Sequence, residues 1–93
     1  MPRRIITKPR FERAYQALSS SAQEAVDAAL RQFGHYLKIG AAPVGFGMKH
    51  LGKGVYEFRA GLALRIVYIV EEDEIVLSLL GTHDEVRRFL KRR

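Results

Sequence analysis

The sequence predicts an α+β fold: a small mixed, mainly antiparallel sheet of about four to five strands, with an N-terminal helical hairpin packed on one face and a short C-terminal helix. Two observations predict it. Apolar residues recur at helical spacing in the first 40 residues, and short apolar segments separated by turn residues fill the stretch 48–80. Because 93 residues provide for one modest core, we expect a single domain over residues 1–93.

The first half should form a short strand and two helices. A strand is expected around residues 4–8, and Pro9 suits the first turn of a helix with apolar positions at helical spacing. Ser21 and Glu24 form a capping-box pattern at the start of a second helix. The apolar stripe of that helix comprises Ala22, Val26, Ala29, Leu30, Phe33 and Leu37. Residues 40–47 are typical of a loop, with Phe46 against the core.

Four further strands are expected at residues 48–51, 55–59, 63–70 and 75–80. A three-residue connection, 60–62, would join the second and third of these. Its register would turn one set of side chains toward the helices, namely Tyr56, Phe58, Leu64, Ile66 and Tyr68. The opposite face would then carry Glu57, Arg59, Ala63 and Arg65, with Glu57 directly across from Arg65.

Arg65 is the most informative residue, because it is a permanent cation within an otherwise apolar strand. A buried guanidinium without a partner is costly, so it requires an internal carboxylate or an anionic ligand. An ion pair with Glu57 would satisfy it without any function. Arg59 argues for the second explanation, since two guanidiniums facing one carboxylate leave spare positive charge suited to an oxyanion or a phosphate. Both explanations stay open.

The segment from Gly81 to Val86 predicts the end of a strand and the start of a helix. Thr82 and Glu85 form a capping box, which puts His83 in the first helical turn. There the helix dipole disfavours the imidazolium, and a neutral imidazole can transfer protons. The alternative is that His83 is merely tolerated at a helix start. The three histidines lack the spacing of metal ligands, so we expect no metal site.

Charge and composition narrow the class of partner. Sixteen Lys and Arg against ten Asp and Glu give a net charge of +6, which favours polyanionic partners. The absence of cysteine excludes a disulfide framework and a thiolate metal site. The N-terminal residues contain no apolar stretch typical of a signal peptide, and no segment has the length of a membrane span. We therefore expect a cytoplasmic protein with no membrane partner.

Three segments, 51–59, 64–68 and 81–86, together resemble the RelE/ParE superfamily of bacterial type II toxins. The resemblance extends over nearly the whole chain. It implies a toxin controlled by a cognate antitoxin, whose flexible and often acidic segment would cover the basic surface. RelE-type members cut mRNA in the ribosomal A site without a metal or cofactor, through attack of a ribose 2′-hydroxyl on its 3′-phosphate. ParE-type members share the fold and inhibit DNA gyrase.

The resemblance also implies roles for individual residues. Arg65 matches the arginine that contacts the phosphate, and His83 lies where a proton-transfer group is expected. Glu57 would orient Arg65 or act as a base, and Arg59 would add positive charge. Further contacts to RNA are expected from Lys49, His50, Lys53, Arg87 and Arg88.

One departure keeps alternatives open. Arg87 stands where several RelE-type enzymes have a tyrosine. This leaves room for a ParE-like gyrase inhibitor without nuclease activity, or for a non-catalytic basic module that binds RNA. For the antitoxin, we expect a dock along the helical hairpin edged by Tyr15, Leu18 or Tyr36.

Overall fold

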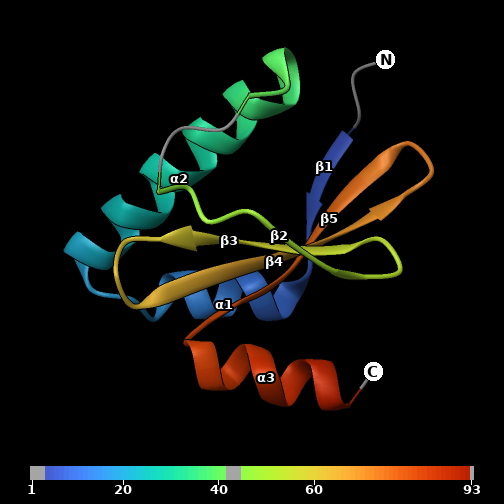
Figure 1. Ribbon diagram of the computed structural model, residues 1–93. Helices are drawn as coiled ribbons and strands as arrows, with labels where there is room; N and C mark the ends of the chain where they lie inside the picture. Colours follow the sequence, from blue (N-terminus) through green and yellow to red (C-terminus); the bar gives the residue numbers. More distant parts are fainter. Residues whose placement is uncertain (1–3, 42–44, 93) are drawn as a thin grey trace.

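The chain folds into three layers, with a sheet between two helices on one face and one helix on the other (Figure 1). The computed structural model describes residues 4–41 and 45–92. Its elements in chain order are β1 (Arg4–Thr7), α1 (Pro9–Gln16), α2 (Ser20–Ile39), β2 (Lys49–Gly52), β3 (Val55–Ala60), β4 (Leu64–Glu71), β5 (Glu74–Gly81) and α3 (His83–Lys91). This confirms the predicted α+β fold.

The strands of the described chain form one five-stranded sheet in the order β1-β5-β4-β3-β2. β1 pairs with β5 in parallel, and the remaining neighbours are antiparallel. The first strand, β1, therefore lies at an edge of the sheet, and the last strand, β5, lies between β1 and β4. The mixed, mainly antiparallel sheet of the prediction is confirmed.

The main core lies between the sheet and the pair α1 and α2. Phe33 of α2 is 1% exposed, and its ring lies 4.7 Å from that of Phe58 and 4.7 Å from that of Tyr68. Phe46 is buried as predicted, with its ring 4.8 Å from Phe58. Aromatic rings packed at these distances contribute beyond the area they bury. This cluster holds α2 firmly against β3 and β4.

The start of α2 differs from the prediction. Ser19, not Ser21, is the N-cap, and its hydroxyl accepts a hydrogen bond from the backbone N–H of Ala22 at 3.2 Å. The capping box expected from Ser21 and Glu24 is therefore wrong. Three consecutive serines offer the same capping group, so the side chains alone do not choose among them.

The register of β3 and β4 also differs from the prediction by one pair. Ala60 pairs with Leu64, so the connection comprises residues 61–63, and Arg59 rather than Glu57 faces Arg65. Ala60 is small and 1% exposed, which lets the strand continue through it into the core, and Gly61 adopts the left-handed φ of 69° that starts the turn. The connection still has three residues, so Tyr56, Phe58, Leu64, Ile66 and Tyr68 pack toward α2 as predicted. Ala63, which was expected on the opposite face, lies in the connection instead.

A β-bulge in β5 positions the last helix. Val67 pairs with Leu79 whereas Tyr68 pairs with Leu77, so Ser78 is an extra residue, and its hydroxyl donates to the carbonyl of Val76. The extra residue lets Leu77 and Leu80 both face α1 and α2 while Leu79 faces α3. The bulge also sets the pairing of Gly81 with Arg65 of β4, and α3 begins two residues later at His83.

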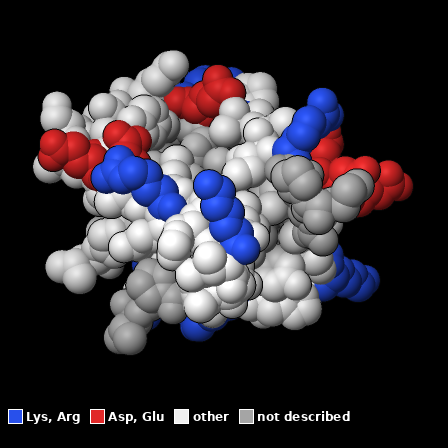
Figure 2. All heavy atoms as spheres, turned by 90° about the horizontal axis from the view of Figure 1, so that it is seen from above, with Lys and Arg blue, Asp and Glu red and all other residues white. Residues whose placement is uncertain are grey.

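α3 covers the second face of the sheet through a smaller cluster of Val55, Val67 and Val86, against which Leu51, Ile69, Leu79, Phe89 and Leu90 pack. No helix in the described ranges has the length and apolar character needed to cross a membrane. The face turned away from α3 carries blue and red side chains interspersed among uncharged atoms (Figure 2). Among the described residues seen in this view, the Lys and Arg side chains form no continuous positive patch of the kind that favours a polyanion.

Candidate functional site

The site is built around an ion pair between Arg65 of β4 and Glu57 of β3. The guanidinium Nη1 donates to Oε2 of Glu57 at 2.6 Å. The Glu57 side chain is 5% exposed, whereas that of Arg65 is 19% exposed. The carboxylate of Glu57 is thus buried, whereas the guanidinium of Arg65 reaches solvent. The ion pair neutralises the buried carboxylate and leaves the guanidinium accessible.

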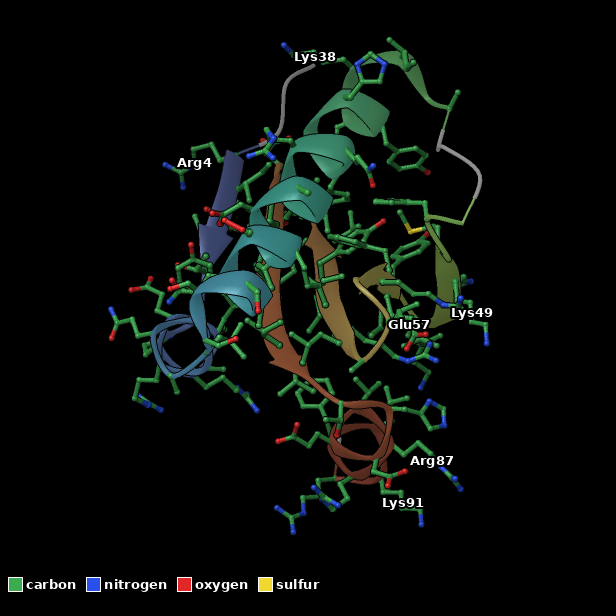
Figure 3. The ribbon with its side chains drawn as sticks, turned by 90° about the vertical axis from the view of Figure 1, so that its left-hand side faces the viewer. Arg4, Lys38, Lys49, Glu57, Arg87 and Lys91 are labelled. Atoms are coloured by element: carbon green, nitrogen blue, oxygen red, sulfur yellow. The ribbon has the colours of Figure 1, made fainter. Side chains whose placement is uncertain are left out.

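Lys49 adds a second cation beside this pair. It lies directly across from Glu57 in the β2–β3 register, and its side chain is exposed. Directly opposed residues of paired strands point to the same face of the sheet. Figure 3 shows Lys49 and Glu57 on the same flank of the molecule as Arg87, whereas Arg4 and Lys38 lie far from them. This flank combines one buried carboxylate with several exposed cations.

The start of α3 lies next to Arg65, because Gly81 is its strand partner. The predicted capping box is confirmed: the Thr82 hydroxyl accepts from the N–H of Glu85 at 3.2 Å, and the Glu85 carboxylate accepts from the N–H of Thr82 at 2.8 Å. His83 is exposed in the first turn. Arg87, one turn later, lies on the same side of the helix as His83.

Three predicted residues lie away from this group. Arg59 faces Arg65 in the register, but its side chain passes over Gly47, and Arg59 lines a hollow beside α2. The ring of His50 packs on that of Tyr56 at 4.7 Å, on the α2 face of the sheet. Lys53 lies in the β2–β3 turn, at the end of the sheet opposite α3's start.

Arg88 belongs to the other flank of α3. It lines a hollow with Arg10, whose guanidinium carbon lies 5.1 Å from the centre of the Phe89 ring. Arg10 was missed by sequence reasoning, because a contact between the first helix and the last leaves no local signal. Arg87 and Arg88 therefore face different surfaces although they are adjacent in sequence.

The three residues expected at the edge of an antitoxin dock are half-buried in the hairpin. The hydroxyl of Tyr15 donates to Asp27 at 2.8 Å, and this hydrogen bond raises the pKa of Tyr15 above its ordinary value. Leu18 and Tyr36 pack against the main core. Each keeps part of its surface accessible, so packing and docking are compatible at these positions.

The arrangement suits phosphate chemistry. A guanidinium has five N–H donors, and Arg65 gives a bond from one nitrogen to Glu57 while its side chain stays 19% exposed, so donors remain for a ligand. A preorganised cation of this kind stabilises negative charge that develops on a phosphate. Among the described residues, no three His, Cys, Asp or Glu side chains cluster in a way that could hold a metal ion.

Solved structures of toxins share this fold. A chain of the archaeal RelE–RelB complex from Pyrococcus horikoshii matches with a TM-score of 0.66 and 20% identity, over 88% of this protein and 96% of that chain. A chain of the E. coli DinJ–YafQ toxin–antitoxin complex matches with 0.67 and 14%, over 92% and 98%. The YoeB/ParE toxin from Agrobacterium tumefaciens matches with 0.65 and 16%, over 86% and 98%. No protein-family model and no curated protein matched the sequence.

Proposed function

We propose that this chain, whose fold is that of RelE- and ParE-type toxins, is the toxin of a type II toxin–antitoxin system and cleaves mRNA on the ribosome. The observation that carries the proposal is the half-open Arg65–Glu57 pair beside the start of α3. The pair neutralises the buried carboxylate and still leaves the Arg65 guanidinium accessible to an anionic ligand. The place of action would be the cytoplasm, where ribosomes and message meet.

In the proposed reaction, a ribose 2′-hydroxyl attacks the adjacent phosphorus. The new bond joins the 2′-oxygen to phosphorus, the bond to the 5′-oxygen breaks, and the products are a cyclic 2′,3′-phosphate and a 5′-hydroxyl. Arg65 holds the phosphate and stabilises the charge on its non-bridging oxygens. His83 takes the proton from the 2′-hydroxyl or gives one to the leaving oxygen.

The remaining residues of the flank would serve binding. Glu57 is 4% exposed and bonded to Arg65, which favours an orienting role over that of a base. Lys49 and Arg87 would contact the RNA backbone on either side of the scissile phosphate. The proposed antitoxin would hold the toxin inactive through an acidic segment, in keeping with the net charge of +6.

One observation favours a second candidate. Arg87 replaces the tyrosine found in several RelE-type enzymes, and a ParE-like inhibitor of DNA gyrase needs no catalytic group there. A non-catalytic RNA-binding module is the third possibility, in which Arg65 only grips phosphate. Both differ from the nuclease in leaving message intact.

Two assays separate these candidates. Purified protein is added to translating ribosomes, and separately to a gyrase supercoiling reaction, as wild type, Arg65→Gln and Arg31→Ala. Arg31 is an exposed arginine of α2 outside the flank and serves as the control. The nuclease predicts ribosome-dependent message cleavage that Arg65→Gln loses and Arg31→Ala keeps. Loss of supercoiling with intact message would establish the gyrase inhibitor instead.

A further inference from the structure

A second cationic surface lies on the flank of α3 that faces α1. It is a hollow of about 350 Å³ lined by Arg10, Leu79, Glu85, Arg88, Phe89 and Arg92. Leu79 and Phe89 are half-buried and belong to the cluster beneath α3, so they give the hollow an apolar side. The hollow is separate from Arg65, which lies beside the first residue of the helix.

The charges of the hollow are unbalanced. Three guanidiniums line it with one carboxylate, that of Glu85. That carboxylate already accepts the N–H of Thr82 in the capping box. Within the described ranges, the arginines that form ion pairs are Arg4 and Arg65, so none of the three in the hollow has a carboxylate partner. The hollow therefore holds positive charge that an anion can neutralise.

One guanidinium of the hollow is held in place before any ligand arrives, and the other two lie on one side of α3. Arg10 lies over the face of Phe89, which restricts its orientation, as cation–π contacts do. Arg88 and Arg92 are four residues apart, and side chains at this spacing lie on one side of a helix, about 5–6 Å apart at Cβ. Ordered arginines lose less conformational entropy on binding and match phosphate oxygens with paired donors.

From these observations we infer that the hollow binds the phosphate backbone of an RNA segment at a second site, distinct from the one at Arg65. The ligand class rests on the proposed RNA-directed function. RNA is favoured over an acidic protein segment because the flank already proposed to bind RNA, with Arg87, lies on the other side of the same helix, so one RNA chain can contact both flanks. The two sites together would bind RNA on both sides of α3. This would explain how Arg88, which lies away from Arg65, can still contact RNA.

The test measures binding without cleavage. The affinity of the whole protein for a fluorescently labelled RNA stem–loop is determined by anisotropy at increasing KCl concentrations. Each lost phosphate contact lowers the slope of log K against log salt concentration by about one. We expect the slope to fall by about two in Arg88→Ala/Arg92→Ala and by about one in Arg10→Ala. Arg31→Ala, the matched control, leaves it unchanged.

Arg10→Ala changes a different helix from the double variant, so misfolding of one does not decide the result, and circular dichroism checks each protein. An unchanged slope in both variants would overturn the inference, as would an equal loss in Arg31→Ala. A labelled oligo-glutamate peptide is titrated in parallel. If the double variant weakens the peptide alone, the occupant is an acidic protein segment and the inference is wrong.

The result is separable from the proposed cleavage. A wild-type protein that fails to cut message would contradict the nuclease, yet the salt dependence of stem–loop binding would still report on the hollow. Conversely, the wild type could cleave message normally while the substitutions of Arg10, Arg88 and Arg92 leave the salt slope unchanged. That result would support the proposed function and contradict the second site.

Discussion

Arg65 reaches Glu57 diagonally across two antiparallel strands, because its direct partner in the register is another cation, Arg59. Two guanidiniums opposed on one face would repel each other. The Arg59 side chain instead passes over Gly47, where the absence of a Cβ makes room for it. Glu57 is therefore left to Arg65, and the outward part of that guanidinium is open to a ligand.

The first prediction concerns the contribution of the Arg65–Glu57 pair to the stability of the protein, apart from any role in cleavage. Glu57→Gln removes the buried carboxylate and leaves Arg65 without its ionic partner, so we expect unfolding free energy to fall by about 1–3 kcal/mol. Urea denaturation measures it, with Glu24→Gln on the exposed side of α2 as the control.

The double variant Glu57→Gln/Arg65→Gln removes both charges at once. It should recover part of the stability that Glu57→Gln loses, because no buried charge is left unpaired, and it should have no cleavage activity. Retained cleavage in the double variant would remove Arg65 from the proposed mechanism.

The second prediction concerns the capping box that fixes the start of α3. Thr82→Ala removes the acceptor for the Glu85 N–H and should cost about 1 kcal/mol of unfolding free energy. His83→Gln, at an exposed position, should leave stability unchanged and reduce cleavage by about 10²-fold or more. Single-turnover cleavage and thermal unfolding are compared for both. Full cleavage by His83→Gln would exclude the proton-transfer role.

The third prediction concerns Gly47. It has a φ of 72°, and a Cβ there would lie 2.8 Å from Cγ of Arg59. Gly47→Ala should therefore destabilise the protein by about 1–2 kcal/mol through backbone strain, and by an additional amount through the clash. In Gly47→Ala/Arg59→Ala the clash disappears and the strain remains. A double-mutant cycle by urea denaturation measures the coupling, and additive effects would show that the two residues do not interact.

The fourth prediction tests the main core. Phe33 packs against the rings of Phe58 and Tyr68 and is 1% exposed, so Phe33→Ala should lower the unfolding free energy by about 3–5 kcal/mol. Leu62, at the tip of the β3–β4 turn, is fully exposed, and Leu62→Ala should change it by no more than about 0.5 kcal/mol. Chemical denaturation of both variants checks this contrast.

Much of the fold was predictable because its signals are local. A cation inside an apolar strand requires an anion, and Glu57 was one of the two candidates that the sequence left open. The Thr82–Glu85 box and the helical stripe of α2 were likewise predictable from spacing. The faces taken by the apolar residues of β3 and β4 followed from the length of one connection, which both registers share.

The features that the sequence did not predict are of two kinds. In some, a residue suits two local structures equally well, and in others the decisive contact joins distant parts of the chain. Ala60 suits a strand end and a turn alike, so burial against α2 decided the register. Arg59 has the residue type and the strand position of a site residue, and only the neighbouring Gly47 explains why it points away. The contact of Arg10 with Phe89 joins the two ends of the chain, and no periodicity indicates it.

The extra residue at Ser78 has a consequence for how the chain tolerates change. Removing it would invert the sides taken by every residue of β5 that follows, and the last helix would set out from the side of the sheet that α1 and α2 already occupy. Because that face has no space for another helix, a one-residue deletion at this point should prevent α3 from packing on the sheet. Arg65 would then lose its neighbours from α3. Natural variants of this chain should therefore lengthen or shorten at the turns, never here.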